Sequence, residues 1–413
     1  MMENRSFDHV LGALTLEGKT DVDGVSLDRS NADTLGRPRY AGRLAGARAR
    51  RFRPDPPHDP SSVLLQLSEG MGGFVKAFER RHLAAADPGD VMRFLTRAEL
   101  PITYFLADEF TVCDRWFCPQ PGPSVPNRLV SLSGHSAGHR DNPRPRDCPF
   151  GIEVETLFDH LEDDWIQYAG SIPVSLLISP LRERLLQGQK LRSLSRFFED
   201  AAHGRLPALS WIDPVYSWAE PSLLDPSFPE PTDDHPPSDV ARGQTLFRRV
   251  YQALVENAEV WRGVVLVVTY SQHGGFYDHV QPPTLAAEER DPALGFESRG
   301  PRVPAIVVSP YAERQGVCHQ VFDHVSVLRF ICDWKKLPHF HPRIARAASL
   351  AAALTEDFRE DVPHVPADPL SSHLKERSHE LIEPHEFSNL LTELAAAVDE
   401  HVPGALASVF AAG

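Results

Sequence analysis

The sequence predicts an α/β fold in which buried strands alternate with amphipathic helices. Residues 263–270 and 303–309 are short apolar runs rich in β-branched side chains and bounded by turn residues, a pattern typical of buried parallel strands. Residues 240–259, before the first run, carry apolar side chains at helix spacing. A helix, a strand and a polar loop form the repeating unit of an open α/β sheet, in which ligands bind beyond the carboxyl ends of the strands.

The rest of the chain is rich in loops, with 37 prolines. Residues 29–62 and 214–238 have no regular period, so we expect irregular excursions from the core there. From residue 343 onward, alanine, leucine and glutamate recur at helix spacing, interrupted at 363–369, which predicts two peripheral helices around a loop. The chain opens directly on the polar motif MMENRSFDH, and we expect a first strand to be missing before it.

Composition excludes several classes of protein. The 413 residues include 42 basic and 57 acidic side chains, a net charge of −15, which argues against a nucleic-acid-binding protein. No apolar run approaches the roughly 18 residues of a transmembrane helix, and no signal-peptide pattern precedes the first motif. The five cysteines show neither a CxxC pair nor zinc-finger spacing, which excludes a zinc module. We therefore expect a globular protein with neither a nucleic-acid partner nor a membrane span.

Two motifs carry oxygen-bearing side chains suited to catalysis or metal binding. Glu3 and Asn4 would offer two oxygen donors to a hard cation, although a surface turn with a helix cap would look the same. Ser124 lies in GPSVPNR, where prolines and a glycine form a rigid turn, and Arg128 or a helix start after Asn127 could hold an anion. A serine nucleophile needs a base or a metal to activate it, so the plainer interpretation of Ser124 as a turn or N-cap residue stays open.

Histidines gather in loop motifs. His58 follows two prolines, His235 precedes two prolines, and His273 stands before two glycines just past the predicted strand 263–270. Asp323 and His324 form a further pair. Glycine permits positive φ and the close approach of other groups, so the HGG motif brings backbone near whatever it binds. Isolated histidines are more often surface or core groups than ligands, but clustering in loops favours a functional site.

Taken in order, these segments resemble the bacterial phosphoesterase family that contains phospholipases C of the non-haemolytic and haemolytic type and a group of acid phosphatases. The resemblance covers roughly residues 1–335. It rests on ENRSFDH, PPH, CDRWFC, GPSVPNRL, SGHSAG, LPALSWIDP, HPP, HGGFYDHVQPP, RVPAIVVSPYA and DHVSVLRFI. It implies a three-layer α/β/α, alkaline-phosphatase-like fold with a mostly parallel central sheet and long loops. Residues 1–340 would form this domain, and residues 341–413 a helical tail packed on it.

The resemblance also implies metal-assisted hydrolysis of phosphate esters through a covalent phospho-enzyme on Ser124. The substrate would be a phosphomonoester or a phosphodiester such as a phospholipid head-group linkage. Carried over residue by residue, the resemblance assigns catalysis to Ser124, His58 and His235, substrate binding to Asn127, Asn4 and His273, and metal ligation to Glu3, Asn4, Ser271 and Gln272. A divalent metal ion would lower the pKa of the serine hydroxyl, while imidazoles protonate the leaving alcohol.

One departure from the family pattern concerns the metal ligands. The family usually has two acidic residues directly before HGG, whereas this chain has Ser271 and Gln272. Because both are neutral, a divalent cation would lose most of its ligand charge, unless His273 or Asp278 substitutes. Two hypotheses follow: a phosphoesterase that holds its metal weakly, or a relative that binds phosphorylated ligands or a partner without turnover.

Overall fold

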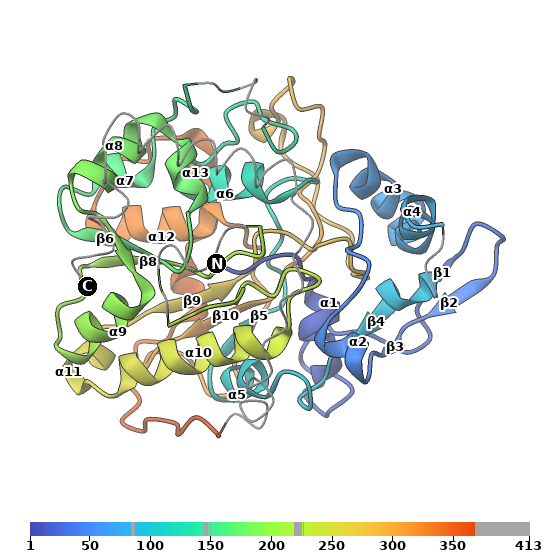
Figure 1. The fold of residues 1–413 in the computed structure, drawn as a ribbon, viewed down its shortest axis with the longest axis horizontal. Coiled ribbons are helices and arrows are strands. Elements are labelled where there is room, and N and C mark those ends of the chain that lie inside the picture. Colours follow the sequence, from blue (N-terminus) through green and yellow to red (C-terminus); the bar gives the residue numbers. More distant parts are fainter. Residues whose placement is uncertain (84–86, 144–147, 149, 219–224, 226, 368–413) are drawn as a thin grey trace.

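The computed structural model describes residues 1–413 except 84–86, 144–147, 149, 219–224, 226 and 368–413. The strands after residue 110 lie in a central layer with helices on both sides, which confirms the α/β class (Figure 1). One side carries α6 (Ser124–Ser133), α7 (Leu157–His160), α8 (Ser179–Gln187), α12 (Val325–Lys335) and α13 (Pro342–Arg346). The other side carries α5 (Pro101–Glu109), α9 (Leu194–Ala202), α10 (Val240–Val255) and α11 (Ala258–Arg262). The predicted helix at 240–259 is thus confirmed as α10, with α11 starting at its end.

The central layer consists of two sheets. A four-stranded sheet has the order β11-β5-β10-β9, formed by Val317–Cys318, Thr111–Cys113, Ala305–Val308 and Leu266–Thr269. A three-stranded parallel sheet has the order β7-β6-β8, formed by Leu191–Ser193, Trp165–Ala169 and Leu209–Asp213. Both predicted strands exist, as β9 and β10.

The expectation that these two strands run parallel is wrong. β10 runs antiparallel to both β9 and β5, with Ile306 opposite Val268 and Val112. The four-stranded sheet is therefore mixed. A continuous apolar run reports burial on both faces of a strand, and it carries no information on the direction of the neighbouring strands.

The first three residues lie between the two sheets. The Met1 amino group donates to Ile212 O at the end of β8, at 3.0 Å. Met2 forms a parallel bridge with Tyr270, and its backbone N–H donates to Thr269 O at 2.8 Å. This pairing carries Glu3 to the carboxyl ends of β8 and β9.

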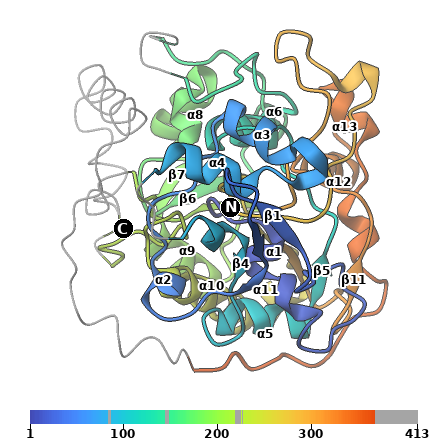
Figure 2. The same cartoon turned by 90° about the vertical axis from the view of Figure 1, so that its right-hand side faces the viewer.

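Residues 7–94 form a group of short elements on one side of the molecule (Figures 1 and 2). They comprise α1 (Phe7–Val10), η1 (Gly12–Leu14), β1 (Ser30–Ala32), β2 (Pro38–Tyr40), β3 (Gly42–Arg43), α2 (Ala47–Arg50), α3 (Pro60–Met71), α4 (Phe74–Arg81), η2 (Pro88–Met92) and β4 (Arg93–Phe94). Residues 29–62 are therefore less irregular than predicted, because short strand pairs form there. The described part of 214–238 has no helix or strand, as expected.

The tail differs from its prediction. The first of the two helices expected after residue 343 is short, because α13 ends at Arg346 and only η7 (Leu350–Ala353) follows before residue 367. The backbone N–H groups of Thr355 and Arg359 donate to Tyr311 O and Pro310 O, both at 2.8 Å, so the chain extends along its neighbour instead. The second predicted helix lies outside the described residues. None of the described helices combines the length and apolar character needed to cross a lipid bilayer.

Candidate active site

A serine and a carboxylate meet at the end of the central layer. Ser124 is the first residue of α6, a helix whose ten residues are all buried. Its Oγ donates to Glu3 Oε2 at 2.5 Å, and Ser271 Oγ donates to the same oxygen at 2.7 Å. Glu3 is therefore placed to accept the Ser124 proton, and the start of α6 favours negative charge beside the hydroxyl.

Two glycines bring the surrounding loops together. Gly274 has φ +64°, and a Cβ there would lie 2.2 Å from Asn4 O. A Cβ on Gly275 would lie 2.5 Å from Pro57 O. Only glycine allows backbone to approach this closely, so the HGG motif lets the N-terminal turn and the PPH loop reach one site. Asn4 itself has φ 58°, which turns the chain sharply after Glu3.

The charge of Glu3 is compensated inside the protein. Arg128 lies 2.6 Å from Glu3 Oε1 and 2.9 Å from Asp213 Oδ1, and it donates to Met1 O at 3.0 Å. Its guanidinium also stacks over the Tyr216 ring, 4.7 Å from the centroid. The suggestion that Arg128 holds a substrate anion does not match these contacts, because two buried carboxylates already use its donors.

The residues assigned to a metal do not fit a divalent cation. Gln272 Oε1 accepts from Gly274 N at 2.5 Å, which turns its amide nitrogen toward Asn4 Oδ1, also at 2.5 Å. An N–H donor thus occupies the place where a ligand oxygen is needed. Glu3 is the one carboxylate among the four assigned residues, and it is paired with Arg128. A hard cation needs several uncompensated oxygen ligands, which this set does not offer.

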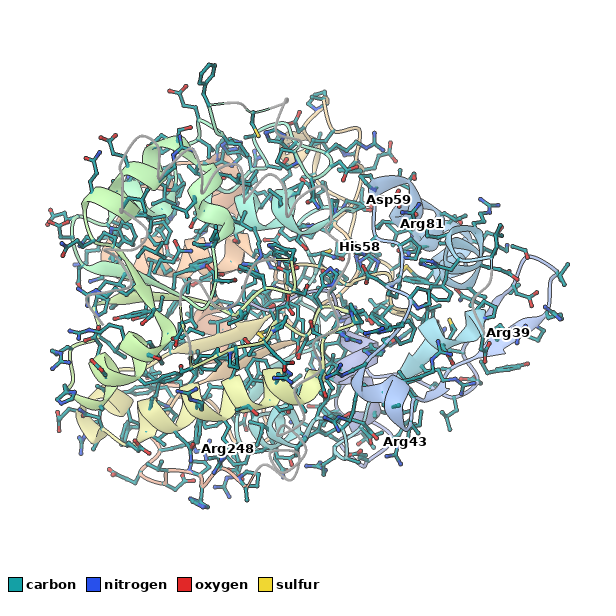
Figure 3. The ribbon with its side chains drawn as sticks, viewed as in Figure 1. Arg39, Arg43, His58, Asp59, Arg81 and Arg248 are labelled. Carbon is teal, nitrogen blue, oxygen red and sulfur yellow. The ribbon has the colours of Figure 1, made fainter. Side chains whose placement is uncertain are left out.

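Two histidines face a partly buried carboxyl beside this cluster. Asp55 Oδ2 lies 3.9 Å from His235 Nε2 and 4.0 Å from His58 Nδ1. His58 Nε2 lies 3.4 Å from Asn4 Nδ2, which joins the histidines to the serine site. In Figure 3, His58 lies between the α3 side and the body that holds the sheets. Burial raises the pKa of Asp55 well above its usual range, which favours the protonated carboxyl beside the imidazoles.

These three side chains are also one of two groups in the described residues that could hold a metal ion, with ligand atoms within 4.8 Å of one another. The other group is Asp8, Asp278 and His279. The Arg302 guanidinium lies 3.0 Å from Asp8 and 2.9 Å from Asp278, so this side chain already neutralises the second group. Asp278 therefore belongs to an internal ion-pair network and does not replace the missing ligands next to Ser271.

Asn127 and His273 lie nearby with other contacts. Asn127 Nδ2 donates to the carbonyls of Gln120, Gly122 and Pro123, and its Oδ1 accepts from Gln120 N. These bonds hold the loop that presents Ser124. His273 Nε2 bonds Gln66 Oε1 at 2.8 Å, and burial lowers the pKa of His273 to about 3. The structure therefore joins Glu3, Asn4, His58, Ser124, Ser271 and Gln272 directly, whereas Asn127 and His273 support the loops around them.

Sequence reasoning missed three contributors. Asp55 directly precedes PPH and Asp213 lies within LPALSWIDP, but only the folded chain places them beside His235 and Arg128. His324 was singled out without a role. It donates from Nε2 to Ser271 O at 2.9 Å and accepts from Trp116 Nε1 at 3.1 Å. Burial lowers the pKa of His324 to about 4, so a neutral imidazole positions the Ser271 loop.

Comparison with known proteins identifies the family of this chain. The sequence model of the phosphoesterase family matches residues 1–338. The chain is 34% identical over 330 residues to non-specific phospholipase C6 of Arabidopsis thaliana, covering 76% of this chain and 61% of that protein. It is 31% identical to non-specific phospholipase C1 of the same plant, and the match covers 79% of this chain and 64% of that protein. The non-hemolytic phospholipase C of Burkholderia pseudomallei is 27% identical, and the match covers 80% of this chain and 53% of that protein.

Solved structures match less closely. An alkaline phosphatase superfamily protein from Vibrio parahaemolyticus covers 78% of this chain and 84% of its own, with a TM-score of 0.36 and 10% identity. The chain spans less than two thirds of the length of the two plant relatives. The family match nevertheless covers most of this sequence, including the motifs around Glu3, Ser124 and Ser271. The chain therefore belongs to the phosphoesterase family.

Proposed function

We propose that this protein hydrolyses phosphate esters with Ser124 as the nucleophile. The observation that carries the proposal is the 2.5 Å hydrogen bond from Ser124 Oγ to Glu3 Oε2 at the N-terminus of α6. Ser124 Oγ attacks phosphorus while its proton passes to Glu3, and the bond from phosphorus to the alcohol breaks. Water then attacks the phosphorylated serine and frees its hydroxyl, releasing inorganic phosphate when the substrate is a monoester and phosphocholine when it is a choline phosphodiester.

The leaving alcohol needs a proton, and the cluster of Asp55, His58 and His235 supplies it. His58 Nδ1 donates to Pro56 O at 2.8 Å and His235 Nδ1 to Pro236 O at 2.6 Å. In the neutral rings this leaves Nε2 as the basic atom. His235 Nε2 faces Asp55 Oδ2 at 3.9 Å and would take a proton from that carboxyl through a bridging water, then pass it to the leaving alcohol, whereas His58 Nε2 faces Asn4 Nδ2. Because Glu3, Asn4, Ser271 and Gln272 do not fit a divalent cation, the proposed steps use only side chains of this protein and water.

The substrate class follows from the relatives. The matching proteins are named phospholipases C, which supports a phosphodiester of a phospholipid head group. A phosphomonoester uses the same nucleophile and proton donor. Release of phosphocholine from phosphatidylcholine, measured beside hydrolysis of an aryl phosphate, separates the two substrates.

The test is Ser124→Ala, with Ser131→Ala as the matched control. Ser131 lies on the same helix, is equally buried, and donates only to Arg128 O. We expect Ser124→Ala to lose about a thousand-fold or more of kcat/KM, because the covalent step needs its nucleophile. The control should keep its activity. Equal turnover in wild type and Ser124→Ala would contradict the proposal.

A second candidate function is binding of phosphorylated ligands without turnover. The neutral pair Ser271 and Gln272, together with the Glu3–Arg128 ion pair, favours it. Binding of phosphocholine with no hydrolysis of either ester, in wild type as in Ser124→Ala, would support this candidate over the enzyme.

A further inference from the structure

Positive charge is concentrated in residues 29–53, which include the β1–β2 hairpin. This stretch has eight arginines and one acidic residue, a net charge of +7 within a chain whose net charge is −15. Figure 3 shows Arg39 and Arg43 on the side of the molecule formed by the short elements. Carboxylates of other elements pair with several of the arginines, as Glu99 does with Arg43 at 2.8 Å. Exposed ion pairs of this kind are weak, so the arginines can exchange them for another anion.

The hairpin is anchored to the protein by one face. Asn31 of β1 is buried, and its Oδ1 accepts from Phe74 N at 2.9 Å. Asp33, also buried, accepts from the backbone N–H groups of Leu35 and Arg37 at 3.0 and 2.8 Å. These bonds fix the turn between the two strands, so the hairpin presents one constant surface to its surroundings.

The opposite face of the hairpin is apolar and exposed. Leu35, at the turn, is 74% exposed, and Tyr40 of β2 is 55% exposed. Pro38 is exposed too, and it lies on the same side of β2 as Tyr40 because side chains alternate along a strand. A leucine and a tyrosine beside arginines are typical of segments that enter the interfacial layer of a bilayer.

We propose that the β1–β2 hairpin and the arginines of residues 29–53 dock this protein on the surface of an anionic lipid bilayer. Leu35 and Tyr40 enter the interfacial layer, and the guanidinium groups bind lipid phosphates. An anionic surface attracts the +7 stretch and repels the rest of the acidic chain, which orients the protein. The choice of lipid over an acidic protein rests on the proposed function, because a phospholipid head group lies in such a surface.

The experiment measures sedimentation of the full chain with lipid vesicles. The vesicles are phosphatidylcholine alone or with about 30% phosphatidylglycerol, an anionic lipid, and the protein carries Ser124→Ala so that turnover consumes no lipid. We expect binding to the mixed vesicles and little binding to the neutral ones. Raising NaCl from about 0.1 M to about 0.5 M should weaken this binding by about tenfold or more, because salt screens the arginines.

Variants of the hairpin separate its charge from its apolar face. Arg37→Gln with Arg43→Gln should weaken binding by about tenfold or more, since each arginine near an anionic surface contributes about fivefold. The same two positions changed to lysine keep the charge and should retain most of the binding. Leu35→Ser with Tyr40→Ser should also weaken binding by about tenfold, with the salt dependence unchanged.

The matched control removes two exposed arginines elsewhere. Arg314 has a side chain 55% exposed and lies 3.0 Å from Glu109, much as Arg43 is 52% exposed and pairs with Glu99. Arg314→Gln with Arg346→Gln changes the net charge equally and should bind vesicles as the parent does.

Vesicle binding is measured without turnover, so its failure is distinct from failure of the proposed function. Binding that is equal for neutral and mixed vesicles, or that either hairpin variant leaves unchanged, would overturn the docking surface. Retention on immobilised polyglutamate with no binding to either vesicle would show an acidic protein as the partner and would also overturn it.

Discussion

Restoring two acidic residues before HGG should convert the site into a metal site. The double variant Ser271→Asp with Gln272→Glu adds two carboxylates beside Glu3. Arg128 cannot compensate their charge, because it already pairs with both Glu3 and Asp213. Ser271 and Gln272 are both 0% exposed, so the new charges are fully buried. Without a cation, each uncompensated buried charge costs about 3–5 kcal/mol. With a cation at about 100 times its Kd, binding returns about 2.7 kcal/mol.

The assay is thermal unfolding in EDTA and in Mg²⁺, Ca²⁺, Mn²⁺ or Zn²⁺, together with calorimetric titration of each metal. The matched control is Ser271→Asn with Gln272 retained, which has nearly the same shape as the acidic pair but no added charge. We expect the double variant to melt below wild type in EDTA and to regain part of that loss with metal. Wild type and control should show little response. Equal metal affinity in wild type and double variant would refute this account of the site.

Two other predictions test the packing and charge around the serine. Gly274→Ala should destabilise the fold by at least about 1 kcal/mol and lower kcat, because the added Cβ would displace Asn4. Gly295→Ala is the control for chemical denaturation and kinetics, because Gly295 has φ +65° and its added Cβ would meet only Arg140 Nη1, at 3.9 Å. Burial raises the pKa of Asp233 to about 8, so the folded state holds its proton more tightly than the unfolded state. Stability should then fall as pH rises from about 4 to 8, and Asp233→Asn should flatten that slope in urea titrations; an unchanged slope would contradict the assignment.

Local patterns were enough to predict the elements that hold the site. The apolar run at 263–270 and the helix spacing at 240–259 report burial and periodicity, which depend on neighbouring residues only. The resemblance carried by the order of the motifs also implied that Glu3, Ser124 and Ser271 belong to one site. In the structure both serines donate hydrogen bonds to Glu3. These features needed no knowledge of the folded chain.

The direction of β10 and the ion pairs of Arg128 and Asp278 could not be predicted, because they depend on residues far away in the sequence. The antiparallel course of β10 is set by its neighbours β9 and β5 and leaves no mark in its own sequence. The position of Arg128 after GPSVPN is typical of an anion-binding group, but its guanidinium pairs with Glu3, 125 positions away. Asp278 likewise looked available, but the fold pairs it with Arg302.

The most direct test of the central claim is to trap the covalent intermediate. Wild type mixed with an aryl phosphate is quenched in acid within the first turnovers and digested, and its peptides are analysed by mass spectrometry. We expect one phosphorylated peptide, with the phosphate on Ser124, and none from Ser124→Ala. Turnover with no phosphorylated peptide, or with phosphate on His58 or His235, would contradict the assignment of Ser124 as the nucleophile.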